Sequence, residues 1–256
     1  MTRRVMSFSL CLAAVVSGAA LAEPTQIAVR VIGKDSKFIG TSMGGMRIVI
    51  RDVDSGAVLA DGITAGSTGD TKKLMIEDRK RGAVISTADA ARYVATIDIN
   101  EPRLVEISAF GPLAQRQGAA RISVTHWVVP GKHITGGDGL MLELPGFIVD
   151  VLEPPTHVKL QGVPQAVNLA ANVMMMCGCP TSAGGMWDSN KFEVRALLQK
   201  DGKAIGDLPL RYAGKESQFT GEWKVSEPGT YQATVYAYDP GNGNTGVDAA
   251  TFVVAK

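Results

Sequence analysis

The chain has little excess of charge of either sign, because its 256 residues include 26 Lys and Arg against 25 Asp and Glu. This balance argues against nucleic-acid binding, which needs a basic stripe, and against electrostatic attachment to a membrane. Several enzyme signatures are also missing: a Gly-x-Ser-x-Gly elbow, a His-Glu-x-x-His motif, a phosphate loop and a Cys-x-x-Cys-His haem attachment. We therefore expect a non-catalytic protein that binds no nucleic acid.

The first 22 residues have the pattern of a secretory signal peptide. Two arginines precede a short apolar run over residues 8–16, and Ala20-Leu21-Ala22 fits the small-x-small cleavage pattern. No later segment reaches about 18 unbroken apolar residues, so we expect no transmembrane segment in the mature chain. Cleavage would leave Cys177 and Cys179 as the only cysteines. We expect a periplasmic or secreted protein, a setting in which disulfides are permitted.

Glycine is abundant, and the apolar segments are short and rich in Val, Ile and Thr, which is typical of an all-β chain. Strands are predicted at 26–32, 46–53, 57–60, 93–99, 103–110, 121–129, 147–152, 157–161, 166–176, 191–199, 208–212, 217–224, 229–238 and 247–254. The charged, Gly-poor segment 70–91 predicts a long loop or one short helix. Glu153-Pro154-Pro155 is the predicted domain boundary, because consecutive prolines disfavour helix and central strand alike. The prediction is two tandem β-sandwich domains, residues 23–153 and 154–256.

The C-terminal part carries a family signature. Residues 228–239 (Pro-Gly-Thr-Tyr-Gln-Ala-Thr-Val-Tyr-Ala-Tyr-Asp) and 243–246 (Gly-Asn-Thr-Gly) resemble the last two strands of bacterial immunoglobulin-like domains. The resemblance covers about residues 157–256 and implies an immunoglobulin-like sandwich, with Tyr231 as a tyrosine corner whose hydroxyl bonds back to the chain. Such domains serve adhesion, spacing and binding alike, so the resemblance implies a fold and no activity. The N-terminal domain shares the strand-rich pattern without this signature.

Sulfur is concentrated in one segment. Met174-Met175-Met176-Cys177-Gly178-Cys179 is followed closely by Met186-Trp187. Alternation along a strand places Met174 and Met176 on one face and Met175 on the other. The predicted topology makes 177–188 an accessible loop at one end of the C-terminal sandwich, where binding functions are commonly carried.

Two interpretations of Cys177 and Cys179 concern bond formation. A disulfide between residues two apart is tight, since an extended chain separates them by about 6.6 Å, but Gly178 allows the chain to bend. Alternatively, both thiolates with the thioethers of Met176 and Met186 would form a donor set that suits Cu(I). Zinc is disfavoured, because a closed zinc site needs four Cys or His donors.

A third interpretation is a thiol-redox protein, which requires a cysteine of lowered pKa. No Lys or Arg lies between Lys159 and Lys191 to lower it. The functional prediction is therefore an exported binding or accessory protein of the cell envelope with a protein partner, binding a soft metal at this loop. The alternatives are a structural or interaction module with a Cys177–Cys179 disulfide, and the thiol-redox protein.

Two further patterns are weaker. His126 and His133 would ligate a metal if they met across a hairpin, but two His without a third ligand favour an exposed His133 and a core Trp127. Residues 42–46 (Ser-Met-Gly-Gly-Met) resemble residues 182–186 (Ser-Ala-Gly-Gly-Met), which is consistent with interstrand loops at equivalent places in two related domains.

Overall fold

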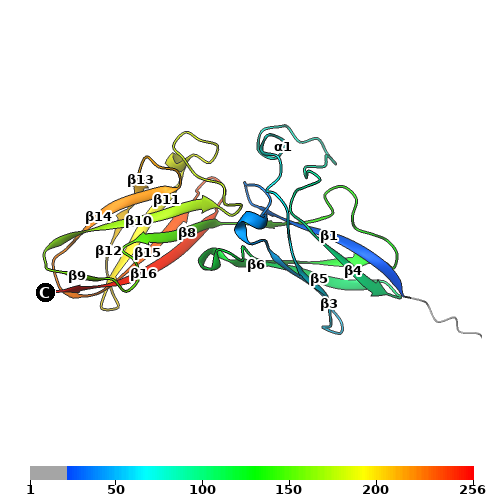
Figure 1. The fold of residues 1–256 in the computed structure, drawn as a ribbon, viewed down its shortest axis with the longest axis horizontal. Coiled ribbons are helices and arrows are strands. Elements are labelled where there is room, and N and C mark those ends of the chain that lie inside the picture. Colours follow the sequence, from blue (N-terminus) through cyan, green and yellow to red (C-terminus); the bar gives the residue numbers. More distant parts are fainter. Residues whose placement is uncertain (1–21) are drawn as a thin grey trace, which may run out of the picture.

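The computed structural model describes residues 22–256 as an elongated, strand-rich molecule (Figure 1). All but the last residue of the predicted signal peptide, 1–22, therefore lies outside the described residues. The strands are β1 (Glu23–Gly33), β2 (Arg47–Asp52), β3 (Val58–Ile63), β4 (Tyr93–Ile99), β5 (Arg103–Gly111), β6 (Ala120–Val128), β7 (Leu140–Leu144), β8 (Phe147–Glu153), β9 (Lys159–Gln161), β10 (Gln165–Met175), β11 (Glu193–Lys200), β12 (Lys203–Pro209), β13 (Arg211–Tyr212), β14 (Gln218–Val225), β15 (Gly229–Tyr238) and β16 (Thr245–Ala255). The helical segments are α1 (Thr71–Met75) and the 3-10 turns η1 (Thr41–Met43), η2 (Arg116–Gly118) and η3 (Ser189–Lys191).

The strands up to Leu144 form two facing sheets, here called the N-terminal sandwich. One sheet has the order β4-β1-β7 and the other the order β3-β2-β5-β6. Alternation along β2 shows how the core forms, because Ile48 and Ile50 are fully buried while Arg47 and Arg51 are exposed. The core between the two sheets is almost entirely aliphatic.

The strands from Phe147 onward form a second pair of sheets, the C-terminal sandwich. Their orders are β13-β14-β10-β8 and β12-β11-β15-β16-β9. This core contains aromatic side chains, among them the stacked rings of Tyr231 and Phe252. The Tyr231 hydroxyl donates a hydrogen bond of 2.8 Å to the Glu227 carbonyl, so the tyrosine corner implied by the sequence is present.

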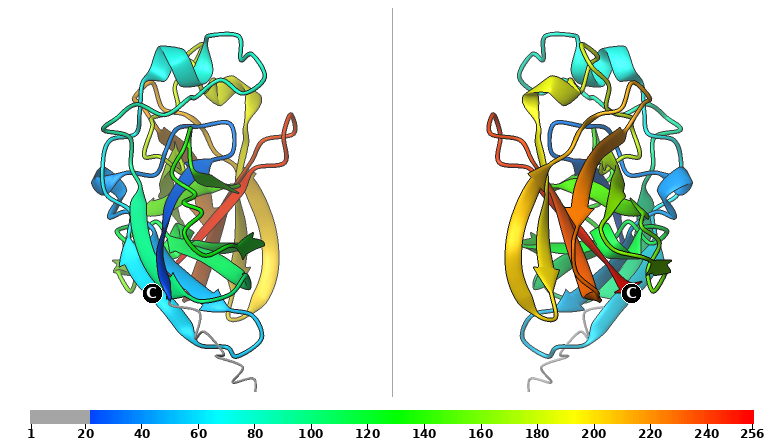
Figure 2. Two further views of the ribbon diagram at one scale, coloured as in Figure 1. Left: turned by 90° about the vertical axis from the view of Figure 1, so that its right-hand side faces the viewer. Right: turned by 90° about the vertical axis from the view of Figure 1, so that its left-hand side faces the viewer.

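Strand order identifies the fold. In an immunoglobulin-like sandwich strands B and E pair in one sheet, while strands C, F and G, often preceded by C′, form the other. In the C-terminal sandwich β10 pairs with β14 as B with E, and β12-β11-β15-β16 follow the order C′-C-F-G. In the N-terminal sandwich β1 pairs with β4, and β3-β2-β5-β6 repeat the same order. The molecule is thus all-β with an immunoglobulin-like fold, and the end-on views of Figure 2 show its layered sheets.

The two sandwiches differ in the strand that lies beside strand B. In the C-terminal sandwich this is β8, which precedes its neighbour β10 and runs antiparallel to it. In the N-terminal sandwich it is β7, the last strand of that sandwich, which runs parallel to β1. Because β7 is parallel to β1, it returns the chain to the end of the sandwich where β1 stops. There Pro145 and Gly146 lead directly into β8.

The predicted boundary Glu153-Pro154-Pro155 lies between β8 and β9, where the chain crosses from one sheet of the C-terminal sandwich to the other. Proline suits this position because it lacks the N–H that continued pairing would need. Phe147 and Val149 of β8 belong to the C-terminal core, although residues 147–152 were predicted as the last strand of the N-terminal domain. Strands β7 and the first part of β12 were not predicted.

A long connection, residues 64–92, covers the outer face of β1 and contains α1, as the loop-or-short-helix prediction allowed. Arg30 on β1 is buried beneath it and donates hydrogen bonds to the carbonyls of Ala90 and Ala91. Met75 of α1 packs against the cluster under this connection and also against the C-terminal core. The connection therefore reaches the neighbouring sandwich.

Candidate functional site: the sulfur cluster at the junction of the sandwiches

Cys177 and Cys179 are joined by a disulfide, with their Cα atoms 5.3 Å apart. The intervening Gly178 has a φ of 76°, a left-handed conformation that shortens the distance an extended chain would impose. The turn is held by the main chain, because Gly178 N–H donates to the Met175 carbonyl and Met175 N–H donates to the Cys179 carbonyl. The structure thus contains the bond that the disulfide interpretation expects.

The expected accessible rim is corrected by the structure. Cys177 is 2% exposed and Cys179 is 6% exposed, and both belong to the C-terminal core. A thiolate attacking this bond must reach a buried sulfur, which opposes thiol–disulfide exchange. The two cysteines are buried because they pack into the core of their own sandwich.

The methionines point in different directions. Met175 lies in the C-terminal core, whereas Met176 lies in the N-terminal core and Met174 packs against it. Met186 is 47% exposed. The four predicted Cu(I) donors are therefore not assembled around one point, and the two cysteine sulfurs are bonded to each other. Within residues 22–256, no three His, Cys, Asp or Glu side chains gather as ligands of a metal ion would. Cu(I) binding stays a prediction that concerns the reduced chain.

The loop that follows β10 is pressed against the N-terminal sandwich. A Cβ added to Gly178 would lie 2.5 Å from the sulfur of Met43, so this close approach requires glycine. Trp187, 8% exposed, donates its indole N–H to the Asp35 carbonyl at 2.7 Å. Both partners, Met43 and Asp35, lie in the connection between β1 and β2.

The connection between β15 and β16 makes the second set of contacts. The fully buried Asn244 donates its side-chain amide to the Lys34 carbonyl at 3.1 Å and accepts from Gly146 N–H at 3.0 Å. Lys34 in turn donates its ammonium group to the Asn242 carbonyl at 2.6 Å. These bonds satisfy polar groups of both sandwiches at their meeting point, where water is largely excluded.

Charge at the junction is not fully balanced. The pKa of Asp35 is raised, first because its carboxylate, although partly exposed, loses some of its water at the junction, and second because of the negative charge of Asp239 in the other sandwich. A hydrogen bond from Asn242 and the charge of Lys191 oppose this rise. Ionised Asp35 therefore carries a cost in the folded protein that it does not carry in the unfolded chain.

The loops that often bind ligands in immunoglobulin-like domains form the contact between the two sandwiches here. In immunoglobulin-like domains, binding loops often connect strands B and C and strands F and G. Here both B–C connections and both F–G connections meet one another, including η2, which packs against β8 and β16. The resembling segments 42–46 and 182–186 both lie in B–C connections. A signal for this burial was present in the sequence, because the apolar run continues past the end of β10 into the loop as Met176 and Cys177.

The histidine loop brings no second donor set together. His126 lies exposed on β6, and His133 accepts a hydrogen bond from Gln26 N–H at 3.1 Å through Nδ1. The prediction that Trp127 packs in the core is wrong, since its side chain is 61% exposed. Trp127 faces away from the core because its register partner, Leu104, lies on the outer face of β5.

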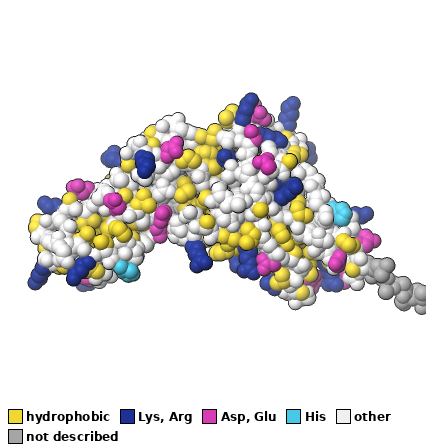
Figure 3. All heavy atoms as spheres, in the orientation of Figure 1, with side chains coloured by type: hydrophobic (Ala, Val, Ile, Leu, Met, Phe, Trp, Pro, Cys, Tyr) yellow, Lys and Arg dark blue, Asp and Glu magenta, His cyan; other side chains and the backbone are white. Residues whose placement is uncertain are grey.

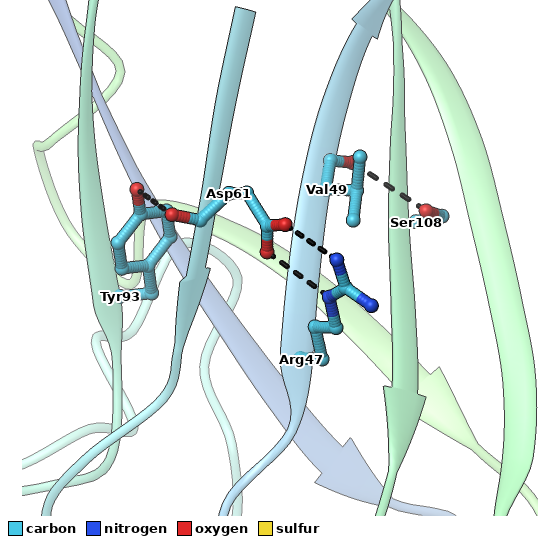
Figure 4. Close-up of polar contacts among 5 residues, drawn as sticks. All are labelled: Arg47, Val49, Asp61, Tyr93 and Ser108. Carbon is cyan, nitrogen blue, oxygen red and sulfur yellow. Dashed lines mark hydrogen bonds and ion pairs between the residues drawn. The ribbon is translucent and has the colours of Figure 1, made fainter. Parts of the chain in front are cut away.

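The opposite edge of the same sheet is closed by polar contacts (Figure 4). Arg47 on β2 donates two hydrogen bonds to the Asp61 carboxylate on β3, at 3.1 and 2.6 Å. This guanidinium holds the pKa of Asp61 below its usual value. Tyr93 on β4 donates its hydroxyl to the Asp61 carbonyl, and its ring leaves no room for a side chain at Gly62. Tyr93 thus joins the two sheets at this edge.

The face of the molecule shown in Figure 3 has no large patch of one charge sign. Acidic and basic side chains are interspersed over the face shown in Figure 3, with apolar side chains between them. No helix within residues 22–256 is both long and apolar enough to cross a bilayer.

No protein-family model matches the chain, and no curated protein matches it. Among solved structures, the fibronectin(III)-like modules of Clostridium thermocellum CbhA overlap 91% of this chain and 94% of their own at 13% identity and a TM-score of 0.28. An engineered protein overlaps 50% of this chain at 15% identity and a TM-score of 0.33, and the chain spans 24% of its length. The fold assignment rests on the strand order described above.

Proposed function

We propose that this is an exported, non-catalytic structural module of the cell envelope, built from two tandem immunoglobulin-like domains that are held as one rigid body. The domain boundary lies at Pro145 and Gly146, between β7 and β8. The sulfur cluster serves as the contact between the domains, and a protein partner binds elsewhere on the surface.

One observation supports this proposal above the others. Met176 directly follows strand β10 of the C-terminal sandwich, yet it is 1% exposed and belongs to the N-terminal core. A loop that fills its neighbour's core is not available to a ligand, and the two domains cannot rotate freely around it. The Trp187–Asp35 and Asn244–Lys34 hydrogen bonds fix the same orientation.

Two glycines of one loop provide a matched test. Gly178 and Gly184 both have left-handed backbones, with φ of 76° and 69°, so alanine strains both similarly. Only at Gly178 does the new Cβ collide with the other sandwich, because nothing lies within 4 Å of a Cβ at Gly184. We expect Gly178→Ala to broaden the distribution of inter-domain distances in small-angle X-ray scattering, and Gly184→Ala to leave it like that of the wild type. A wild-type protein that already behaves as two freely jointed bodies would contradict the rigid arrangement.

Export is tested separately by expressing the full chain in a bacterium and measuring the mass of the product. We expect cleavage before Glu23 and recovery from the periplasm or medium, and we expect Ala22→Arg to block cleavage because the last position of the recognition pattern requires a small residue. Recovery of the uncleaved chain from the cytoplasm would contradict export without affecting the proposed junction.

Soft-metal binding remains a separate prediction for the reduced chain. In the oxidised chain we expect no tight Cu(I) uptake, because the thiolates needed as donors are absent. Tight binding of one equivalent after reduction, lost in a Cys177→Ser/Cys179→Ser variant, would support a metal-binding role for this loop.

A further inference from the structure

Strand β6 has an exposed backbone edge. It ends its sheet, and among residues 22–256 its outer edge has no main-chain hydrogen-bond partner. Its pairing with β5 runs without a register shift from Ala120 to Val128. Apolar side chains flank this edge, because Val124 is 39% exposed and Trp127 is 61% exposed. An uninterrupted edge of this kind is a template for pairing with another strand.

Three other strands at or near sheet edges differ from β6 in this respect. β9 covers the edge of β16, which is the strand equivalent to β6 in the C-terminal sandwich. β3 and β12 are each irregular, with register shifts opposite Ile50 and Leu198. β12 also carries Lys203 and Pro209, residue types that discourage further pairing. Of the sheet edges within residues 22–256, that of β6 is the longest.

The sequence of β6 is complementary to itself. If two copies pair antiparallel about Val124, then Val124 faces Val124, Ser123 faces Thr125, and Arg121 faces Trp127. Arg121 and Trp127 both point away from the core, as their register partners Phe110 and Leu104 do. A guanidinium opposite an indole is a favourable pair, and Arg121 already lies over the Phe110 ring, 5.9 Å from its centroid.

The charges on β6 also favour a second copy of this chain as the pairing strand. Arg121 is the only Lys, Arg, Asp or Glu in β6, so this register places no like charges opposite each other. The two-fold symmetry also produces each favourable cross-strand pair twice.

We propose that two copies of this protein dimerise through β6, antiparallel about a two-fold axis at Val124, so that their four-stranded sheets become one continuous sheet. The interface is isologous, because the same strand contributes from both sides. The surface lies outside the junction of the two sandwiches, so dimerisation does not depend on the rigidity or export proposed above.

The sign of a charge at position 127 tests the register. Trp127→Lys places an ammonium group opposite Arg121 of the second copy, whereas Trp127→Glu places a carboxylate there. Both variants change the same exposed side chain, so we expect both to fold like the wild type, as checked by circular dichroism. By sedimentation, we expect Trp127→Lys to raise the dimer dissociation constant about tenfold or more, and Trp127→Glu to change it less. Similar dissociation constants for the two variants would overturn the register.

A cysteine at the proposed axis tests the geometry. Val124→Cys would place two cysteines opposite each other with their Cα atoms about 4.5–5.5 Å apart, a separation that allows an intermolecular disulfide on mild oxidation. Val58→Cys, on the other edge of the same sheet, is the control and is expected to crosslink poorly. A protein that stays monomeric at roughly millimolar concentration, where even weak interfaces associate, would overturn the proposal. A dimer unaffected by both β6 changes would also overturn it.

Discussion

Strands β6 and β16 occupy the same place in their two sandwiches, yet one edge is open and the other is covered. In the C-terminal sandwich the chain reaches β10 through β8 and β9, and the short β9 pairs with β16. In the N-terminal sandwich the strand beside β1 is β7, which pairs with that strand alone. Within residues 22–256, no strand of the N-terminal sandwich pairs with β6 as β9 pairs with β16, so β6 ends its sheet.

The comparison shows that the sandwich requires a strand in each position but not a particular order along the chain. A parallel β7 buries Leu142 and Leu144 beside β1 as an antiparallel first strand would. The difference appears at the exits instead. The late, parallel strand brings the chain out at the loop end of the N-terminal sandwich, and the two sandwiches therefore meet with their connecting loops face to face.

The largest effect is expected at Met176, because one sandwich supplies this side chain to the core of the other. We expect Met176→Ala to lower the free energy of unfolding by about 2–5 kcal/mol, because it leaves a cavity in a closely packed core. Met186→Ala, at the exposed methionine of the same loop, should change it by less than about 0.5 kcal/mol. Chemical denaturation measures both values, and equal effects would show that Met176 is not inserted.

The next largest effect is expected at the tyrosine corner, which within residues 22–256 is a feature of the C-terminal sandwich and not of the N-terminal one. At the equivalent register position of the N-terminal sandwich, opposite the last residue of β2, lies the buried Val105, which has no hydroxyl to donate. We expect Tyr231→Phe to destabilise the protein by about 1 kcal/mol through loss of the bond to Glu227. Tyr212→Phe should be close to neutral. An unchanged denaturation midpoint for Tyr231→Phe would mean that the corner contributes shape and not stability.

The smallest effect is expected at Asp35. Its folded pKa lies above its unfolded value, so its contribution is fully present below about pH 3.9 and is lost as the pH rises through the folded pKa. Asp35→Asn removes that loss and keeps a residue type that tolerates the left-handed backbone at this position, φ 52°.

We therefore expect the Asp35→Asn variant to melt about 1–2 °C higher than the wild type at pH 7 and at the same temperature near pH 3.5. Asp54→Asn, at an exposed acidic residue in the turn between β2 and β3, serves as the control. A difference in melting temperature that does not vary with pH would show that the charge of Asp35 is not its cause.

Local signals predicted the strands well because they depend on alternation and turn residues. The predicted strands 93–99 and 229–238 coincide with β4 and β15, and Tyr231 lies where the family resemblance placed it. β12 was harder to recognise, since Lys203, Gly206 and Asp207 give it no apolar alternation on a solvent-exposed edge. Its position is set by pairing with β11, which lies inside the sheet.

The sequence predicted which residues form the candidate site but did not predict what surrounds them. The sequence placed Cys177, Cys179 and Met186 in one end loop, and that loop is where they lie. Cys177 and Cys179 are buried in the core of their own sandwich, whereas the burial of Met176 depends on the neighbouring sandwich, whose position follows from the direction of β7. A reversal of chain direction has no signature in local periodicity, so the sequence suggested an open rim where the protein has an internal contact.

The start of strand β1 and the C-terminus lie near opposite ends of the long axis (Figure 1). Met176 and Trp187 connect the two sandwiches in the middle of the molecule. The distance between its two ends is therefore the combined length of two sandwiches placed end to end. Under the proposed rigid junction, these two ends of the described chain stay at a fixed separation.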